Sequence, residues 1–162
     1  MNLEVVQIAK KSESDSQEIN ERSKQLFGAD FVVSRGKCHK PAELDGFVAR
    51  QYTELVGLAT YEISGDMCEL VTIDVFLQWQ GIGKKLMEEV EMEARMAGCK
   101  QVWLITTNDN IEAIHFYQRR GYDMSAHYHN AIEESRKLKP QIPLVGNFGI
   151  PIKHELEFRK NL

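Results

Sequence analysis

The sequence predicts a single domain, residues 1–162, of the α/β (α+β) class, with a mixed, mostly antiparallel sheet and helices on both faces. Three β-rich segments at 46–52, 54–64 and 68–77 follow one another across short turns, which indicates an antiparallel meander. Apolar residues then recur at helical spacing from Gly83 to Ala97. The next apolar run, QVWLITT, is typical of a buried parallel strand.

The N-terminal third is less regular. A β-rich segment at 3–9 predicts a first strand, and Ser and Asp caps after it begin one helix, or two short ones, that end at Gly28. The segment 31–36 is apolar but of undetermined type. Residues 37–46 contain Pro, Gly and Asp, which is typical of a loop or a hairpin connection.

The C-terminal part contains a second amphipathic helix at 111–120 that ends at Gly121, followed by a strand at 122–129. A short helix stops at Pro140, and a long apolar loop with Pro and Gly residues follows it. The alternating run 152–160 predicts a last strand. An inserted helix and loop at about 130–150 therefore separate the last two strands.

Composition excludes several classes of protein. The net charge of −4 does not suit a nucleic-acid surface, which needs clustered Lys and Arg, although it would suit an amine partner. The chain shows neither an apolar run long enough to span a membrane nor a signal peptide. Cys38, Cys68 and Cys99 form no CxxC pair and are expected to be free thiols. We therefore expect a cytoplasmic protein.

The stretch QWQGIGKKL at 78–86 lies between the third strand of the meander and the helix after it. Gly81 and Gly83 allow backbone N–H groups and the positive end of the helix dipole to approach a pyrophosphate. The alternative is a tight turn with close packing. The GxGxxG dinucleotide fingerprint is absent, and so is the GxxxxGK[ST] loop of nucleotide-phosphate binders.

A second motif helps to identify the ligand of this loop. NDNIEAIHFYQRRGY places Asn110, Ala113, Tyr117 and Gly121 on one helix and at its end. Together with QxxGxG at 78–83, this spacing resembles the GCN5-related N-acetyltransferase (GNAT) superfamily over nearly the whole chain. The tail, with its KP-x-IP and GIPI sequences, resembles a bacterial subgroup of that superfamily.

The resemblance implies a sheet that splays between the strands at 68–77 and 101–107, with acetyl-CoA as co-substrate in the gap. The family's phosphate loop corresponds to Gln78, Trp79, Gln80, Gly81, Ile82, Gly83 and Lys84. The strand edge that pairs with the acetyl-pantetheine arm corresponds to Val71, Thr72 and Ile73, and the rest of that arm contacts Asn110, Ala113 and Tyr117.

The resemblance also assigns catalytic roles. Tyr117 corresponds to the general acid that protonates the leaving thiolate, although a helical tyrosine also fits a plain core position. Many relatives carry a basic Glu at the position of Ile105, which has no titratable group. Glu69 and Asp74, on the strand beside the cofactor, are the candidate bases; each also fits a solvated or hydrogen-bonded strand position.

The histidines offer further candidates. His127 and His129 form an HxH pair on one strand face, but no nearby Cys, His or Asp is expected to complete a metal site, so no metal is predicted. His39 and His154 are alternatives for contacting the acceptor, and His115 fits a partly exposed structural position. The apolar loop at 141–150 is predicted to close over the acceptor site opposite 37–45; a dimer contact or extra core is the alternative.

The function that follows is transfer of an acetyl group from acetyl-CoA directly to a primary amine of a small molecule or a protein. The alternative is a non-catalytic acyl-CoA-binding sensor or regulatory module. The isoleucine at position 105 favours the module, whereas Tyr117 favours the enzyme. The acceptor, the base and the oligomeric state, including a homodimer, stay open.

Overall fold

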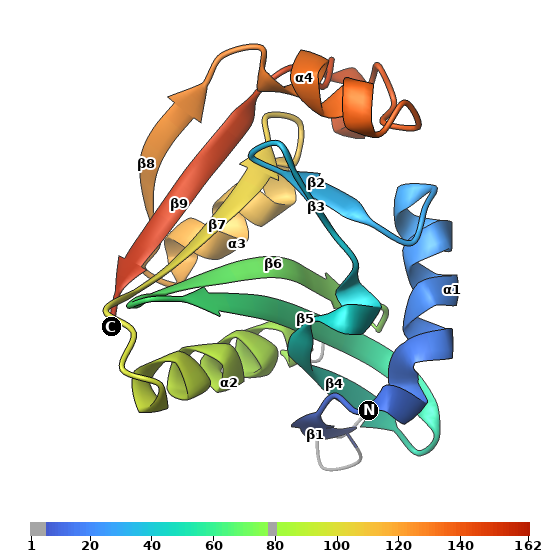
Figure 1. The fold of residues 1–162 in the computed structure, drawn as a ribbon, viewed down its shortest axis with the longest axis vertical. Coiled ribbons are helices and arrows are strands. Elements are labelled where there is room, and N and C mark those ends of the chain that lie inside the picture. The colour runs from blue at the N-terminus through green and yellow to red at the C-terminus, as the bar shows by residue number, and fades with distance from the viewer. Residues whose placement is uncertain (1–5, 78–80) are drawn as a thin grey trace.

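The computed structural model describes residues 6–77 and 81–162, and these contain one seven-stranded sheet. Across the sheet the order is β1 (Val6–Lys10), β4 (Asp45–Gln51), β5 (Glu54–Ser64), β6 (Met67–Val75), β7 (Gln101–Thr107), β9 (Glu155–Asn161) and β8 (Asp123–Tyr128). Only β6 and β7 run parallel among these described strands. The predicted meander and the mixed, mostly antiparallel sheet are thus confirmed (Figure 1).

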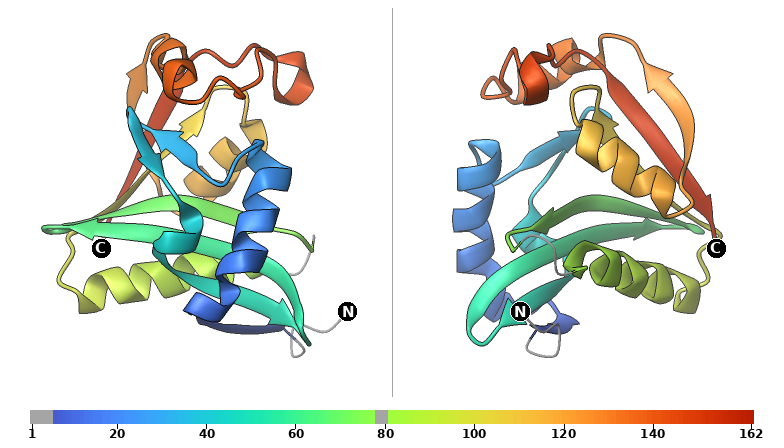
Figure 2. Two further views of the ribbon diagram at one scale, coloured as in Figure 1. Left: turned by 45° about the vertical axis from the view of Figure 1, so that its right-hand side comes forward. Right: turned by 180° about the vertical axis from the view of Figure 1, so that it is seen from behind.

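Helices cover both faces of the sheet, as predicted (Figure 2). On one face lies α1 (Ser16–Phe27), which follows a 3₁₀ turn at Glu13–Asp15 and packs Ile19 against Val48 and Leu58. On the other lies α2 (Ile82–Met96), whose Leu86 and Val90 belong to the main core. Because successive strand residues point to opposite faces, Phe47 faces α2 while its neighbour Val48 faces α1.

The sheet opens between β6 and β7. Their pairing extends only from Met67 opposite Gln101 to Glu69 opposite Trp103. At this point β6 carries a bulge, because Tyr61 of β5 pairs with Leu70 and Thr60 pairs with Thr72. A bulge bends its strand, and β6 leaves β7 from here onward. This confirms the expected splay.

A small second sheet was not predicted. Residues Val32–Ser34 (β2) and Lys37–His39 (β3) form a hairpin, and a 3₁₀ turn (Pro41–Glu43) follows. The two turn residues, Arg35 and Gly36, have φ of 49° and 75°, as the tightest hairpin turns require. The sequence signal for this hairpin was Gly36, in the turn after the short strand at 32–34. The sequence alone leaves the type of 31–36 undetermined and predicts a loop or hairpin connection at 37–46.

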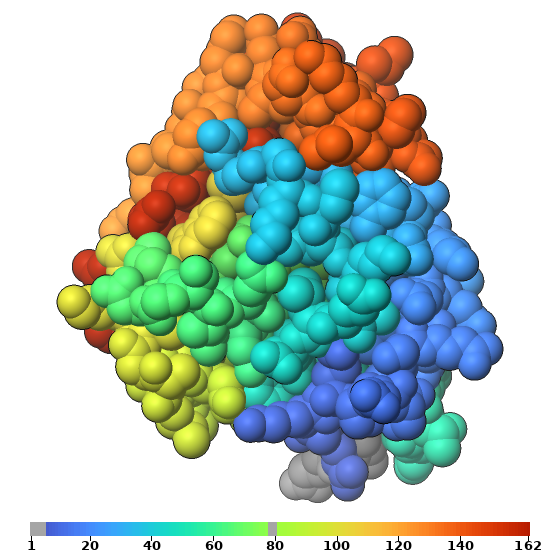
Figure 3. Space-filling view, viewed as in Figure 1, coloured from blue at the N-terminus to red at the C-terminus, as the bar shows by residue number. Residues whose placement is uncertain are grey.

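The predicted insertion lies between β8 and β9. It consists of α4 (Ala131–Leu138), then a loop with a 3₁₀ turn at Asn147–Gly149. α3 (Ile111–Arg119) precedes β8 and lies on the same side of the sheet as α2 (Figure 2). The space-filling view shows the β2–β3 segment directly against the inserted segment (Figure 3). Their contact places two distant parts of the sequence beside the opening of the sheet.

Two sequence-based expectations concern the environment of the chain. None of the helices in the described residues is long and apolar enough to cross a membrane. Cys38, Cys68 and Cys99 are free thiols, as predicted, and the last two are buried.

Candidate active site

A cleft of about 280 Å³ occupies the opening between β6 and β7. The two strands line it with Val71–Asp74 and Ile105–Thr107, and α3 contributes Tyr117. The opposite wall comes from α1, β2 and the inserted segment, with the apolar residues Phe27, Val32, Val33, Ile132, Ile142 and Ile152. The edges of β6 and β7 that face each other beyond Glu69 and Trp103 pair with no strand of the described residues. Such edges can accept an extended ligand.

Tyr117 is held by aromatic packing. Its ring lies 5.6 Å from that of Phe116, 6.2 Å from Tyr122 and 5.9 Å from Phe158. No described protein group forms a hydrogen bond with its hydroxyl, and the residue lines the cleft. Burial raises the pKa of Tyr117, and the nearby charge of Asp74 raises it further. The phenol therefore stays protonated at neutral pH and is available as a donor.

Asp74 lines the same cleft and keeps partial exposure there. Burial raises its pKa from 3.8 to about 7. A carboxyl group with this pKa exchanges its proton near neutral pH, which is the range in which a general base works best. Of the two candidate bases, Asp74 is the one that lies with Tyr117.

Glu69 lies elsewhere. It lines a neighbouring pocket of about 240 Å³ together with His39, Glu62 and Trp103. Ser34 Oγ donates to Glu69 Oε1 at 2.8 Å, and His39 Nε2 lies 3.9 Å from Oε2. Burial raises the pKa of Glu69, which the Ser34 hydrogen bond partly offsets. His39, a candidate acceptor contact, thus faces this pocket rather than the cleft.

The two described glycines of the phosphate loop, Gly81 and Gly83, suit their positions for different structural reasons. Gly81 precedes α2 with φ of 66°, and a Cβ built on it would meet no atom within 4 Å. A Cβ on Gly83 would lie 3.3 Å from the ring of Phe116. Close packing therefore explains Gly83, whereas Gly81 provides a left-handed turn beside open space at a helix N-terminus.

The other loop residues also differ from one another. Gln78, Trp79 and Gln80 lie outside the described residues. Ile82 is buried in the core, so only its backbone can serve a ligand. Lys84 is exposed and lines a surface pocket that also contains Arg119, Arg120 and Lys160. Glu88, 3.8 Å from Lys84, and Glu91, 2.8 Å from Lys160, line the same pocket and partly offset this positive charge.

Asn110 caps α3. Its Oδ1 accepts from the backbone N–H of Ala113 at 3.4 Å, and its Nδ2 donates to Thr106 Oγ1 at 3.3 Å. Asn110 also lines the cleft, so the cap and a ligand contact are compatible. Ala113 is half-buried against the main core, outside the lining of the cleft. Thr72 Oγ1 forms a 2.6 Å hydrogen bond with Oγ1 of Thr60, its partner on the adjacent strand β5.

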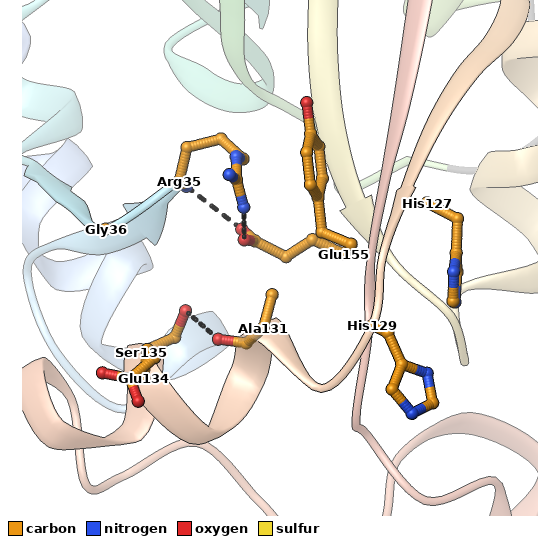
Figure 4. Close-up of a pocket in the computed structure, with 9 residues that line it drawn as sticks. Arg35, Gly36, His127, His129, Ala131, Glu134, Ser135 and Glu155 are labelled. Carbon is orange, nitrogen blue, oxygen red and sulfur yellow. Dashed lines mark hydrogen bonds and ion pairs between the residues drawn. The ribbon is translucent and has the colours of Figure 1, made fainter.

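Sequence reasoning missed an ion pair at the rim. Glu155 of β9 is buried and lines the cleft. Its oxygens accept from the backbone N–H of Arg35 at 3.1 Å and from Arg35 Nη1 at 3.2 Å (Figure 4). The Arg35 guanidinium also lies 3.5 Å from the centroid of the Tyr128 ring. This contact ties the β2–β3 hairpin to β9. In the cleft, β2 rather than 37–45 lies beside the inserted segment.

Replacing Arg35 with alanine is expected to lower the free energy of unfolding by about 1–3 kcal/mol, because Glu155 would lose the side-chain partner of a buried carboxylate. Arg35 is 41% exposed, so solvent keeps the loss below the full penalty of an unpaired buried charge. Urea unfolding measures it. Lys37→Ala is the control: it removes an exposed charge from the same hairpin, and little change is expected. Equal losses in both variants would contradict the role of Glu155.

The expectation that no nearby Cys, His or Asp would join His127 and His129 was wrong. His154 joins His127 and His129, with ring centroids 4.7 to 5.8 Å apart, because β8 and β9 pair antiparallel next to these residues. Their ligand atoms lie within 4.8 Å of one another. However, His154 Nδ1 accepts the backbone N–H of Asn130 at 2.8 Å, which leaves the proton of the neutral ring on Nε2. The cluster therefore does not present three free lone pairs to a metal.

Comparison with known proteins gives consistent results. Residues 6–122 match the model of the Acetyltransferase (GNAT) family. The uncharacterized protein YdhI of Bacillus subtilis is 47% identical over 119 residues, which cover 73% of this chain and 74% of that protein. Two solved structures share the fold at 17% identity. A GNAT family acetyltransferase from Elizabethkingia anophelis with acetyl-CoA bound has a TM-score of 0.72 and covers 98% of this chain and 99% of its own. The IAA acetyltransferase from Bacillus cereus has a TM-score of 0.73, with coverage of 97% and 99%.

Proposed function

The chain belongs to the acetyltransferase (GNAT) family, and we propose that it transfers the acetyl group of acetyl-CoA directly to a primary amine in the β6–β7 cleft. The observation that carries this proposal is the meeting of Tyr117 and Asp74 in one cleft, beside strand edges without a partner in the described residues. Residues 1–162 would act as one catalytic domain, in which the insertion at about 130–150 belongs to the acceptor side.

The described residues fit acetyl-CoA. Gly81 leaves open space before the first N–H groups of α2, where a pyrophosphate would be stabilised, and Lys84 lies one turn further along. The free edge of β6 at Val71, Thr72 and Ile73 suits an extended pantetheine arm, which the side of α3 at Asn110 and Tyr117 would flank. When bound, acetyl-CoA supplies an activated acetyl group as a thioester.

Asp74 and Tyr117 can handle the two protons of the reaction. Asp74 accepts a proton from the acceptor ammonium, directly or through water, so that the neutral amine forms a C–N bond with the acetyl carbonyl carbon as the C–S bond breaks. The Tyr117 hydroxyl donates its proton to the leaving sulfur, and the second proton that the nitrogen loses as the amide forms returns to the Tyr117 oxygen. A backbone N–H of β6 near Ile73 would stabilise charge on the carbonyl oxygen. The carboxyl group of Asp74 would serve as the base in place of the Glu that many relatives carry at the position of Ile105. Glu69 would act only at longer range, through Ser34.

The test is release of CoA from acetyl-CoA in the presence of a panel of primary amines, with the product identified by mass spectrometry. We expect release that depends on the amine and an N-acetylated product. Binding of acetyl-CoA without acceptor-dependent release would instead indicate a sensor or regulatory module and would contradict the proposal.

Replacing Gly81 with alanine is expected to raise KM for acetyl-CoA while kcat at saturation stays close to that of the wild type. The new Cβ strains a left-handed residue, at about 1–2 kcal/mol, at the position where the phosphates would bind. Gly98→Ala is a matched control, because Gly98 has φ of 84° at the other end of α2 and also meets no atom within 4 Å. We expect both variants to lose stability in thermal unfolding and only Gly81→Ala to raise KM. An equal KM for acetyl-CoA in the two variants would show that Gly81 does not belong to the cofactor site.

A further inference from the structure

A buried lysine on the acceptor side of the cleft has no carboxylate partner among the described residues. Lys139 follows α4, is 5% exposed and lines the cleft. Its Nζ donates to the carbonyl oxygen of Phe31 at 2.8 Å, and the rings of Phe27 and Phe31 lie 5.5 and 5.3 Å away. An ammonium group has three N–H donors, so two of them have no hydrogen-bond partner in the described protein.

This environment disfavours an isolated positive charge. Burial lowers the pKa of Lys139, an effect that the nearby Cys38 offsets only in part. A buried ammonium is best satisfied by an anion that also accepts its remaining hydrogen bonds. Because Lys139 lines a cleft that is open to small molecules, a ligand can supply that anion.

Neither carboxylate of the cleft neutralises Lys139. Both oxygens of Glu155 accept hydrogen bonds from Arg35, so that charge is already balanced. Asp74 forms no ion pair with Lys139 in the described residues, and the group whose pKa its charge raises is Tyr117. The same cleft also has apolar lining from Phe27, Ile132, Ile142 and Ile152.

We propose that the acceptor is an amine with an apolar body and a carboxylate, and that Lys139 binds this carboxylate. The inference rests on the proposed function, because it names the acceptor class of the same cleft. The cleft of about 280 Å³ is small for a ligand site, since such pockets begin at roughly 300 Å³, and the acetyl end of the pantetheine arm would occupy part of it. A free apolar amino acid therefore suits the cleft better than a peptide does.

The experiment compares acceptors that differ in structure only by the carboxylate: L-leucine with 3-methylbutylamine, and L-phenylalanine with 2-phenylethylamine. Each kcat/KM is referred to the concentration of neutral amine, because the carboxylate also lowers the pKa of the amino group. We expect wild-type kcat/KM to favour the amino acid of each pair by about tenfold or more, the effect of one charge-assisted hydrogen bond. Equal kcat/KM within each pair, or a preference for the decarboxylated amine, would overturn the proposal without any variant being made.

The variants assign the preference to Lys139. Lys139→Met keeps the length and apolar stem of the side chain, and we expect it to lose the preference chiefly through KM, whereas Lys139→Arg should retain part of it. Lys137→Met is the control, because Lys137 is exposed on α4 and pairs with Glu134. A Lys139→Met protein that is folded by circular dichroism and still prefers the amino acids would overturn the assignment.

A binding measurement separates this inference from the proposed function. 4-Methylpentanoate is leucine without its amino group, and 4-methylpentanamide is its neutral counterpart. We expect the carboxylate, but not the amide, to raise the melting temperature of the wild-type protein, and neither to affect Lys139→Met. If no amine is acetylated, the proposed transfer fails, and the carboxylate site is still decided by this comparison. No shift with the carboxylate would overturn it.

Discussion

Tyr117→Phe is expected to lower kcat by roughly a hundredfold or more, the usual contribution of a well-placed general acid. The substitution removes only the hydroxyl that faces the cleft, and the phenyl ring can keep its contacts with Phe116, Tyr122 and Phe158. Binding of acetyl-CoA should therefore stay nearly unchanged. Single-turnover kinetics at saturating acetyl-CoA measures the chemical step, and isothermal titration calorimetry measures the binding.

Tyr122→Phe is the matched control for this prediction. Tyr122 belongs to the same aromatic cluster, but its hydroxyl donates to Glu91 Oε2 at 3.5 Å rather than facing the cleft. We expect Tyr122→Phe to affect stability and to leave the single-turnover rate close to that of the wild type. An unchanged rate in Tyr117→Phe, or an equal loss in both variants, would argue that Tyr117 is only a core aromatic residue.

Asp74→Asn is expected to lower kcat/KM strongly and to change its dependence on pH. The pKa of Asp74 is about 7, so the ionised form that accepts a proton increases as pH rises through 7. Wild-type kcat/KM should rise across this range, beyond any rise from deprotonation of the free amine. The asparagine variant should show only the amine's own dependence, measured with two acceptors of different pKa. If the rise of kcat/KM near pH 7 persists in Asp74→Asn, the base is another residue. Glu69→Gln is then the next variant to test.

The same carboxyl group should affect stability with a definite sign. Its folded pKa of about 7 exceeds the ordinary value of 3.8, so the folded state disfavours its ionisation. The resulting loss of stability is absent below pH 3.8, grows as pH rises and is complete above about 7, where it is on the order of 4 kcal/mol. Asp74→Asn should therefore be more stable than the wild type at pH 8 and similar to it near pH 4.

Asp15→Asn provides a control of opposite sign in the same urea-unfolding series. Burial alone would raise the pKa of Asp15, but hydrogen bonds from the Ser12 N–H and from Arg50 lower it overall. Its charge therefore stabilises the fold at pH 8, and its removal should destabilise the protein there. A destabilised Asp74→Asn at pH 8 would contradict the burial of an unpaired carboxyl group at this site.

Local sequence patterns predicted most of the elements that build the cleft. The strands at 54–64 and 101–107 have those bounds in the structure, and the helix of QWQGIGKKL begins at Ile82. These segments carry strong periodicity, and turns or glycines limit them. The hairpin at 32–39 escaped because each of its strands is short and has no alternation, so only the Arg35-Gly36 turn marks it.

The acceptor side could not be predicted in the same way. Arg35 and Glu155 are far apart in sequence, as are Lys139 and Phe31, and their contacts depend on how the insertion packs against β2. His154 reached His127 and His129 through strand pairing that no local pattern specifies. Likewise, Glu69 and Asp74 had equal standing as bases in the sequence, and only the bulge and splay of β6 separate their surroundings.

A pulse-chase measurement tests the central claim, direct transfer in the β6–β7 cleft, most directly. The protein is first incubated with a stoichiometric amount of acetyl-CoA, an amine is then added, and CoA and acetylated product are quantified over a single turnover. Direct transfer predicts no CoA release before the amine is added, and then equal amounts of CoA and N-acetylated amine. Stoichiometric CoA release before the amine, or an amine that stays unmodified, would contradict it.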